Sequence, residues 1–339
     1  MIRIGIVGCG YWGPNFVRNF NQIPGSSVVA ICDLRQERLE EIRQLFPDIK
    51  TYNTVDPLLN DKNIDAVVIS TPATTHYAVA KAALENNKHV LVEKPLSVKT
   101  ADCEDLIRLA RNSGKVLMVG HTFLFNPAVR KMKELLDRKT LGKLYYIHCR
   151  RTNLGPLRKD VNAVWDLCAH DIAIINYLLG NKPLKASARA ARFLSHRVED
   201  VGFITLEYPR NILVHAHVSW LDPKKIREMT IIGSKKMLVY DDTNSLEPIR
   251  VYDKKVMKKK YDRPYHDFKE FQLIITDGEV TIPKVNMTEP LKHECQHFLD
   301  SIIKNVAPLT DGKNGLETVA VLEAIDKSIK NNGKNTGVL

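Results

Sequence analysis

The stretch of residues 291–300 contains the sequence H-E-x-x-H, a pattern that holds a catalytic zinc ion in metallopeptidases. His293 and His297 are four residues apart and share one face of a helix, where Glu294 could act as a general base. Glu317, twenty residues beyond His297, offers a third candidate ligand. The pattern makes a zinc hydrolase the first hypothesis to weigh.

A helical projection of the same stretch argues against zinc. With about 100° per residue, the apolar side chains gather on one side of the helix, and His293 and His297 fall nearly opposite them, beside Asp300. The apolar side consists of Leu291, Cys295, Phe298, Leu299, Ile302 and Ile303. We therefore interpret both histidines as solvent-face residues and keep the zinc hydrolase as a minor alternative, which predicts bound zinc and loss of activity in His293→Ala.

A glycine-rich turn near the N-terminus indicates a nucleotide site. The sequence GCGYWG follows an apolar strand and opens a helix, so Gly8, Gly10 and Gly13 permit a tight turn and let backbone N–H groups approach a pyrophosphate. Asp33 ends the next predicted strand, where a carboxylate accepts from both ribose hydroxyls and repels a 2′-phosphate. The pattern predicts NAD as the cofactor. NADP is left as an alternative because two cations, Arg35 and Arg38, lie nearby in the sequence.

Three other polar residues stand where secondary structure would direct them into a site. Lys94 ends a predicted parallel strand, and open α/β sheets bind ligands at the carboxyl ends of their strands. Asp166 and His170 are four residues apart on an otherwise apolar helix, so their side chains share a face. The alternative for this pair is a satisfied polar pair in a core helix.

The first 121 residues alternate apolar strands with amphipathic helices. This rhythm predicts βαβ units and a doubly wound α/β Rossmann domain with a parallel sheet. The predicted strands are 2–8, 28–33, 65–71, 89–94 and 116–121, and the predicted helices begin at 14, 35, 76 and 101.

The rest of the chain, residues 122–339, predicts an α+β domain with a mostly antiparallel, open-faced sheet. Short strands follow one another at hairpin intervals after two helices, and two helices close the chain. The predicted helices are 127–142, 164–180, 290–304 and 314–331, and the predicted strands are 143–153, 185–195, 201–208, 212–220, 227–234 and 236–242.

Composition limits the class of protein. With 44% hydrophobic and 26% charged residues, no long apolar run and no signal-peptide cleavage site, the 339 residues predict a cytoplasmic protein that does not cross a membrane. Its six cysteines show no CxxC pair and are expected to be reduced thiols. The net charge of +11 suits an anionic substrate; residues 254–260, interpreted as a solvated loop, supply five of these charges, and no nucleic-acid motif accompanies them.

Several motifs together resemble the glucose-fructose oxidoreductase and inositol dehydrogenase family, Gfo/Idh/MocA, over nearly the whole chain. Besides the N-terminal strand, they are VLVEKPLS at 90–97, STPATTHYAVAKAAL at 70–84, GHTFLFNPAV at 120–129 and WDLCAHDI at 165–172. The resemblance implies an NAD(P)-dependent dehydrogenase acting on CH–OH groups, with hydride transfer from a sugar ring carbon to nicotinamide. Lys94 would then stabilise the developing alkoxide, His170 would accept the hydroxyl proton, and Asp166 would orient the imidazole.

These motifs also carry the remaining site predictions. The predicted cofactor-binding residues are Gly8, Gly10, Tyr11, Trp12, Gly13, Asp33, Thr71, Pro72, His76, Glu93 and Lys94. The predicted substrate-binding residues are Lys94, Asn126, Asn153, Arg158, Asn162 and His170. Arg158 with Lys159 could meet a phosphate, although loop and cap roles are the alternative for the weaker members. No metal ligand is predicted.

The stretches 120–129 and 150–172 look most like the branch that oxidises the 3-hydroxyl of UDP-N-acetylated sugars for surface polysaccharide or lipid A. UDP-N-acetylglucosamine is the predicted substrate, and its glucuronate counterpart is second. The alternatives are a dehydrogenase of free sugars or inositols, and a cofactor-binding regulatory protein without turnover. The open sheet face predicts a homodimer or homotetramer.

Overall fold

The computed structural model describes residues 1–155, 157–194, 197–256 and 275–339, and it divides the chain into two compact units. The first unit is Met1–Phe125 with Glu289–Glu323, and the second is Asn126–Thr288 with Ala324–Leu339. Residues 289–323 thus pack with the first unit, whereas the sequence placed them in a single domain from residue 122. Their apolar side chains join the core of the first unit, which the linear order of the chain does not reveal.

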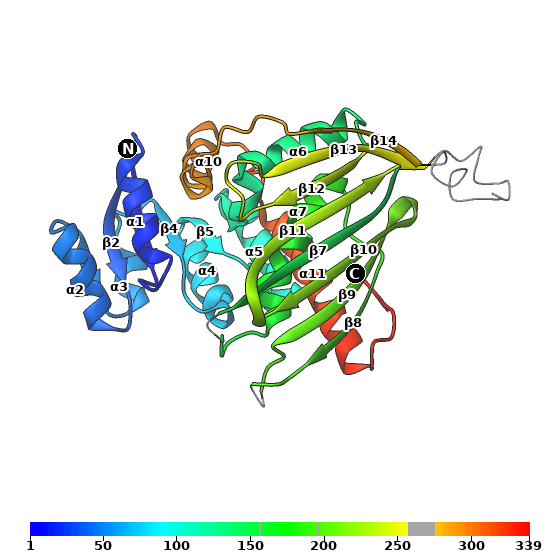
Figure 1. The fold of residues 1–339 in the computed structure, drawn as a ribbon. Coiled ribbons are helices and arrows are strands. Elements are labelled where there is room, and N and C mark those ends of the chain that lie inside the picture. Colours follow the sequence, from blue (N-terminus) through cyan, green and yellow to red (C-terminus); the bar gives the residue numbers. More distant parts are fainter. Residues whose placement is uncertain (156, 195–196, 257–274) are drawn as a thin grey trace, which may run out of the picture. The chain divides into compact units, whose positions relative to one another are not determined.

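The first unit contains a six-stranded sheet in the order β3-β2-β1-β4-β5-β6, with every neighbouring pair parallel (Figure 1). The strands are β1 (Ile2–Val7), β2 (Ser26–Cys32), β3 (Lys50–Tyr52), β4 (Ala66–Ile69), β5 (His89–Glu93) and β6 (Leu117–Gly120). The helices are α1 (Gly13–Gln22), α2 (Gln36–Leu45), α3 (Val55–Asn60), α4 (His76–Glu85), α5 (Thr100–Ser113) and α10 (Pro290–Lys304), with 3₁₀ turns η1 (Ala73–Thr75) and η2 (Thr122–Phe125). This confirms the predicted Rossmann topology, whose strand order reverses between β1 and β4.

The core of the first unit explains why α10 returns to it. Phe16 and Phe20 of α1 stack with their ring centroids 6.3 Å apart, and the Phe298 ring of α10 lies edge-on to Phe20 at 6.4 Å. All three rings are fully buried. Burying an aromatic side chain of this size is worth a few kcal/mol, so α10 is held to α1 by its apolar stripe.

The second unit is built on a nine-stranded sheet in the order β14-β13-β12-β11-β7-β10-β9-β8-β15, in which β7 and β10 are parallel and the other neighbours antiparallel. Its strands are β7 (Leu144–Leu154), β8 (Lys185–Ala191), β9 (Val201–Tyr208), β10 (Ile212–Ser219), β11 (Leu221–Gly233), β12 (Met237–Asp241), β13 (Ile249–Val256), β14 (Ile275–Thr281) and β15 (Thr336–Gly337). Its helices are α6 (Pro127–Asp137), the π-helical η3 (Val164–Cys168), α7 (Ala169–Leu179) and the turn η4 (Pro209–Asn211); α11 (Gly312–Lys330) begins in the first unit and ends in this one. The mostly antiparallel sheet is the predicted one.

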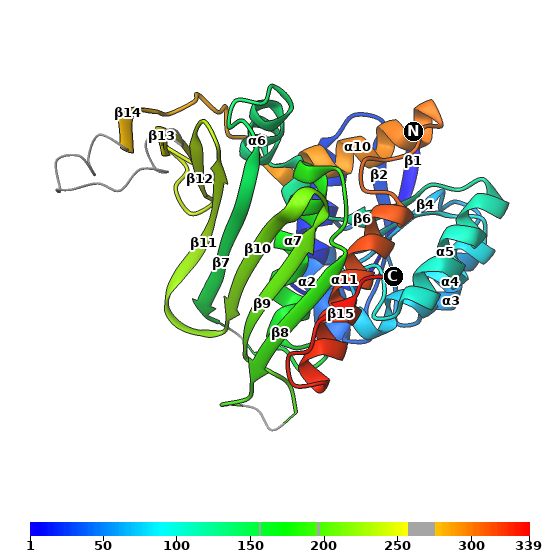
Figure 2. The same ribbon diagram turned by 90° about the vertical axis from the view of Figure 1, so that its right-hand side faces the viewer.

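The two faces of this sheet differ in burial. Along β7 the side chains of Ile147 and Cys149 are buried, whereas the alternate residues Tyr146 and His148 are exposed. Helices α6 and α7 lie against the buried side of the sheet (Figure 2). Alternation of this kind is the signature of a sheet with one covered face and one open face, as the sequence predicted.

Three minor expectations can be compared with the structure. The basic run at 254–260 is not entirely a loop, because residues 254–256 end β13; the remainder lies outside the described residues. The six cysteines are free thiols, and all are buried. In the described part of the chain, no helix is long and apolar enough to span a bilayer.

A buried ion pair fixes α7 to the sheet of the second unit. The Arg151 guanidinium on β7 donates to both carboxylate oxygens of Asp171 on α7, at 2.8 to 3.2 Å, and both side chains are about 95% buried. Removing one partner of such a pair leaves an uncompensated buried charge. The pair therefore holds the helix that carries His170 in a defined position on the sheet.

We predict that Asp171→Ala lowers the free energy of unfolding of the second unit by roughly 3–5 kcal/mol, because Arg151 is left buried without its counter-ion. Urea unfolding followed by tryptophan fluorescence measures this, since Trp165 and Trp220 both belong to this unit. Glu41→Ala, which removes an exposed ion pair with Arg38 on α2, is the control and should change stability little. Equal effects of the two variants would contradict the assignment.

Candidate cofactor and catalytic site

The turn after β1 is shaped by close backbone contacts. Gly8 has φ +97°, and a Cβ added to it would lie 2.6 Å from the Ser70 carbonyl oxygen. A Cβ on Gly13 would lie 2.4 Å from the carbonyl oxygen of Gly8. At Gly10, by contrast, the nearest atom to an added Cβ is the Arg35 guanidinium at 3.9 Å. Gly8 and Gly13 are thus required by the protein's own packing. Gly10 instead faces open space, in which a ligand can come close to the backbone of the turn.

The N-terminus of α1 has the features of an anion site. The helix begins at Gly13 with Pro14 in its first turn, and it has no side-chain cap and no acidic residue in that turn. Its first N–H groups and the positive end of its dipole are therefore available to a pyrophosphate. Tyr11 and Trp12 are exposed next to it, with their rings edge to face at 5.4 Å. These residues fit the predicted dinucleotide.

Asp33 ties the end of β2 to this turn. Its Oδ2 accepts from the backbone N–H of Cys9 at 2.7 Å, and its Oδ1 accepts from the backbone N–H and side chain of Arg35 at 3.0 and 3.2 Å. Burial alone would raise the pKa of Asp33, but hydrogen bonds from Arg35 and Cys9 outweigh it and lower the pKa. A carboxylate is thus fixed beside the glycine turn, where the sequence placed the ribose contact.

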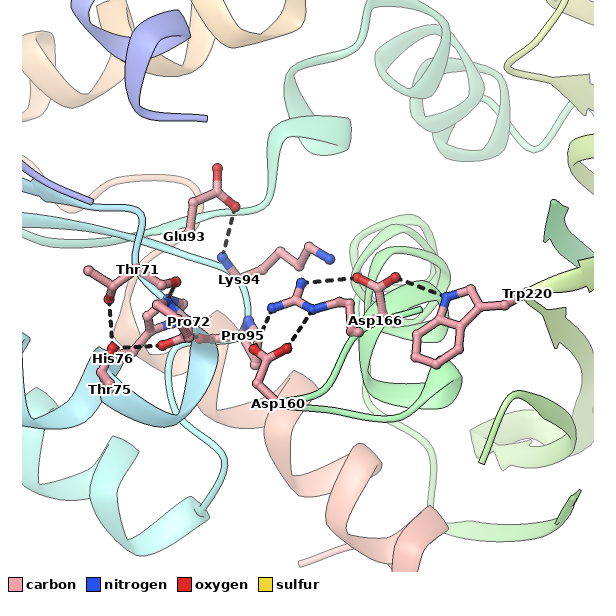
Figure 3. A network of polar contacts seen from close by, with 11 residues as sticks. Thr71, Pro72, Thr75, His76, Glu93, Lys94, Pro95, Asp160, Asp166 and Trp220 are labelled. Atoms are coloured by element: carbon pink, nitrogen blue, oxygen red, sulfur yellow. Dashed lines mark hydrogen bonds and ion pairs between the residues drawn. The ribbon is translucent and has the colours of Figure 1, made fainter. Parts of the chain in front are cut away.

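The segment after β4 is joined to the E-K-P turn after β5. The buried imidazole of His76 lies 2.7 Å from the carbonyl oxygen of Pro95 and 2.9 Å from that of Thr71 (Figure 3). The Thr75 hydroxyl contacts both Thr71 and Pro72 at 2.8 Å. His76 therefore connects two loops at the carboxyl edge of the sheet. Its contact with the cofactor stays a prediction.

Glu93 and Lys94 occupy the carboxyl end of β5. Glu93 is buried, and its Oε2 accepts from the backbone N–H of Lys94 at 3.2 Å. Lys94 is half-buried and precedes a cis peptide bond to Pro95. Because β1, β4 and β5 run parallel, Lys94 lies at the same edge of the sheet as the glycine turn.

In the second unit, Asp166 lies within a π-helical segment rather than in a regular helix. Its Oδ1 accepts from Arg158 and its Oδ2 from the Trp220 indole, both at 3.2 Å (Figure 3). Such π-helical turns are frequent at functional sites. His170 is half-buried in the first turn of α7, four residues after Asp166. The two residues of the predicted pair therefore lie on consecutive helical elements, η3 and α7, and Asp166 is held from two sides.

The weaker substrate predictions have structural partners. Asn126 caps α6 by accepting from Ala128 N–H at 2.8 Å, and its amide donates to Asp242 at 3.2 Å. Asn162 accepts from Trp165 N–H at 3.0 Å and donates to Glu199 at 2.9 Å. Both asparagines fit the alternative reading of cap residues, and a substrate contact for either stays a prediction.

Arg158 and Asn153 complete this group. Arg158 donates to Asp160 at 2.6 and 2.9 Å as well as to Asp166, so two carboxylates already engage its guanidinium. The neighbouring Lys159 is exposed, and Asn153 is half-buried near the end of β7. The proposed phosphate contact of Arg158 stays a prediction, and it would compete with these ion pairs.

The H-E-x-x-H helix differs from its helical projection at two positions. His293 is exposed as expected, but His297 is half-buried: its Nε2 accepts from Leu309 N–H at 2.8 Å and its ring lies 5.3 Å from that of Phe125. Ile303, expected in the buried stripe, is 62% exposed. The chain folds back after α10 and covers His297, which a projection of one helix does not include. Within the described ranges, no group of three His, Cys, Asp or Glu side chains could hold a metal.

Two residues of the candidate site, Trp220 and His121, were not predicted from the sequence. Trp220 stands 54 residues after Asp166, and no local pattern connects them. His121 follows β6 directly and is fully buried, with neither ring nitrogen in a hydrogen bond among the described residues. Burial, and next the charge of Lys94, lower the pKa of His121 to about 3, so its ring is neutral. Its position after a buried parallel strand was the available signal.

Comparison with protein families identifies both units. Residues 2–121 match the oxidoreductase family GFO_IDH_MocA, described as an NAD-binding Rossmann fold, and residues 129–239 match the GFO/IDH/MocA C-terminal domain. The chain belongs to the Gfo/Idh/MocA family. The match confirms the resemblance inferred from the motifs, and it makes the glycine turn, α1 and Asp33 parts of an NAD-binding unit.

Individual relatives cover only part of the chain. Inositol 2-dehydrogenase of Salmonella typhimurium is 32% identical over 183 residues, which are 52% of this chain and 54% of that enzyme. Myo-inositol 2-dehydrogenase of Thermotoga maritima is 27% identical over 206 residues, or 59% and 62%. The chain thus spans about half to three-fifths of the length of these curated relatives.

Solved structures match over nearly the whole length. UDP-N-acetylglucosamine 3-dehydrogenase GnnA from Acidithiobacillus ferrooxidans has a TM-score of 0.82 and 22% identity, covering 97% of this chain and 98% of that one. The WlbA dehydrogenase from Bordetella pertussis, solved with NADH and UDP-GlcNAcA, has a TM-score of 0.81 and 20% identity, covering 100% and 99%. At these identities the likeness establishes the fold.

The two kinds of glycine can be separated by experiment. We predict that Gly10→Ala folds normally but weakens NADH binding at least about tenfold, or about 1.4 kcal/mol, because its methyl group occupies the ligand side of the turn. Gly13→Ala should instead lower the melting temperature, since its Cβ meets the Gly8 carbonyl oxygen. NADH fluorescence titration and thermal unfolding measure the two effects. Unchanged NADH affinity in Gly10→Ala would place the pyrophosphate elsewhere.

Proposed function

We propose that the protein is an NAD-dependent dehydrogenase that oxidises a ring hydroxyl of a sugar, with the 3-hydroxyl of UDP-N-acetylglucosamine as first candidate. The observation that carries the proposal is Lys94, a half-buried cation at the carboxyl end of β5, on the sheet edge that bears the glycine turn. A cation at that edge is suited to a hydroxyl that becomes an alkoxide beside the cofactor.

Each of the proposed catalytic residues has a separate role in the reaction. The Lys94 ammonium stabilises the negative charge that develops on the substrate oxygen, and the imidazole of His170 accepts the hydroxyl proton. Asp166, fixed by Arg158 and Trp220, favours the charged form of His170 after proton transfer. When bound, the nicotinamide supplies the acceptor for the hydride that leaves the same carbon.

Charge and motif support a nucleotide sugar as substrate. The surplus of eleven positive charges suits a diphosphate, and the stretch 150–172 resembles the UDP-sugar branch of the family. Since two carboxylates engage Arg158, the exposed Lys159 is the better candidate for a phosphate contact. Oxidation at C3 would prepare a 3-amino sugar for surface polysaccharide or lipid A.

Inositol or free-sugar oxidation is the second candidate. It is favoured by the curated relatives, which include inositol 2-dehydrogenases at 32% identity. An inositol enzyme would use the same lysine, aspartate and histidine but would not require a nucleotide. The glucuronate counterpart of UDP-N-acetylglucosamine is an alternative within the first class.

Substrate class is tested by absorbance at 340 nm with NAD and a panel of UDP-sugars, free sugars and inositols. We expect NADH to form with UDP-N-acetylglucosamine, and kcat to fall on the order of 10²- to 10⁴-fold in Lys94→Ala and in His170→Ala, because each removes a group that acts on the reacting hydroxyl. His293→Ala is the matched histidine control and should keep wild-type activity.

Other outcomes have defined meanings. NADH formation with an inositol alone would replace the substrate but keep the catalytic residues. Activity that survives the combined Lys94→Ala and His170→Ala changes would refute the mechanism. Loss of activity in His293→Ala together with stoichiometric zinc would restore the hydrolase hypothesis.

We also propose that a second copy of the chain covers the open face of the nine-stranded sheet. Large apolar side chains are exposed there, among them Phe203 at 49%, Leu213 at 48% and Tyr146 at 47%. The Phe203 ring stacks on His217 at 4.5 Å, giving a flat aromatic surface on adjacent strands. Contiguous apolar surface of this kind is typical of an interface.

Light scattering tests the assembly. We expect a mass of two or four times 38.5 kDa, and we expect Phe203→Glu to shift it toward one, because a charge would be buried without a partner in the interface. Leu246→Glu, at a position 90% exposed between β12 and β13, is the control and should leave the mass unchanged. A wild-type mass of 38.5 kDa would refute the proposal.

A further inference from the structure

Glu294 is the part of the H-E-x-x-H sequence that the proposed function leaves without a role. Its side chain is fully buried on α10, and neither carboxyl oxygen has a hydrogen-bond partner of good geometry among the described residues. An isolated buried carboxylate is costly, so such a group keeps its proton or shares one with a neighbour.

The neighbour is Glu93, the residue before Lys94. Glu93 is 6% exposed and pairs in register with Gly120 of β6, where an added Cβ would lie 3.3 Å from the Glu93 carboxyl carbon. A side chain at 120 would therefore displace Glu93. Helix α10 packs against η2, which follows β6, and Thr122 of η2 and the charge of Glu93 both act on Glu294. Burial, and next the charge of Glu93, raise the pKa of Glu294 well above its usual range.

The titratable and polar groups around the two carboxyls come from four parts of the chain. Lys94 follows β5 directly, and the neutral, buried His121 follows β6 directly. Thr122 of η2 favours the charged form of Glu294, by less than burial and Glu93 oppose it. Cys295 of α10 is a buried thiol whose pKa burial raises well above its usual value. Two buried carboxyls that repel each other keep one proton between them, because a second negative charge is disfavoured by burial and by the first charge.

Another cation near α10 is already engaged. Arg18 of α1 donates to both carboxylate oxygens of Glu289, at 2.5 and 3.1 Å, just before α10 begins. Glu289 also accepts from Asn19 at 3.1 Å. Arg18 therefore serves the start of α10, and both of these hydrogen bonds go to Glu289 rather than to Glu294.

We propose that Glu294 is a positioning residue that carries a proton at neutral pH and, by donating it in a hydrogen bond to Glu93, fixes the backbone at Lys94 for cofactor binding. Two adjacent buried carboxyls titrate as a pair, and the second proton leaves only at high pH. The Glu93 carboxylate accepts from Lys94 N–H, so whatever holds Glu93 also holds the end of β5. This role requires no zinc and is independent of the substrate.

The sign of the pH dependence follows from the proton count. Because the folded protein holds a proton on Glu294 that the unfolded chain releases near its ordinary pKa, stability falls as pH rises between the unfolded and folded pKa values. Cofactor binding that needs the protonated pair weakens above the folded pKa, by up to about tenfold per pH unit.

The test is the NADH dissociation constant, measured by fluorescence across about pH 6 to 10. The wild-type constant should rise toward the alkaline end, whereas in Glu294→Gln this rise should disappear, because an amide donates to Glu93 at every pH. Asp300→Asn, also on α10 but paired with Lys304 near solvent, is the control and should follow the wild type. A constant wild-type affinity, or a Glu294→Gln variant that keeps the wild-type rise, would overturn the proposal.

A second measurement needs no variant. Infrared spectroscopy of the wild-type protein with ¹³C-labelled glutamate should show a protonated glutamate at pH 7 that disappears at alkaline pH. The label separates Glu294 from Asp326, whose pKa burial also raises. Absence of a protonated glutamate at pH 7 would refute the shared proton. Because both measurements use no sugar, their outcome is separate from that of the proposed substrate.

Discussion

The rest of the first unit depends on how closely its backbone approaches itself after β1. The carbonyl oxygen of Gly8 lies where a Cβ on Gly13 would be 2.4 Å away, so the chain can turn directly from the first strand into α1 only because position 13 has no side chain. That contact aims the uncapped start of α1 over the carboxyl edge of the sheet. Asp33 reinforces it by accepting from Cys9 N–H. The NAD-binding geometry is thus a consequence of packing that exists without the ligand.

The polar groups that follow buried strands lie inside the protein, away from water. Each of them therefore needs a partner within the protein. In the first unit, groups distant in sequence meet at these strand ends: His76 lies 2.7 Å from the carbonyl oxygen of Pro95, and burial, and next the charge of Glu93, raise the pKa of Glu294 on α10. The His76 contact joins two loops at the carboxyl edge of the sheet, where open α/β sheets bind ligands. In the second unit, Arg158 and Trp220 likewise hold Asp166 through hydrogen bonds to its carboxylate. Several of the predicted site residues are therefore held by side chains that are distant from them in sequence.

The H-E-x-x-H sequence shows how a short motif gains its meaning from its surroundings. In isolation its two histidines and glutamate are compatible with zinc. In the folded chain His293 is exposed, His297 accepts from Leu309 N–H, and Glu294 is fully buried, with its pKa raised by burial and by the charge of Glu93. The arrangement separates the three side chains into three environments. A role for Glu294 then follows from its burial rather than from the motif.

The sequence by itself determined the Rossmann sheet, the glycine turn, Asp33 and the family, because these are written in local spacing: apolar runs of strand length, glycines at fixed offsets and an acid at a strand end. It also indicated Lys94, Asp166 and His170 through the family motifs. Only the tertiary structure decided that residues 289–323 pack with the first unit, that Trp220 holds Asp166, and that Glu294 is buried where Glu93 raises its pKa. These contacts join residues far apart in the chain, and burial, which sets their charge, is a property of the packed fold rather than of any short stretch.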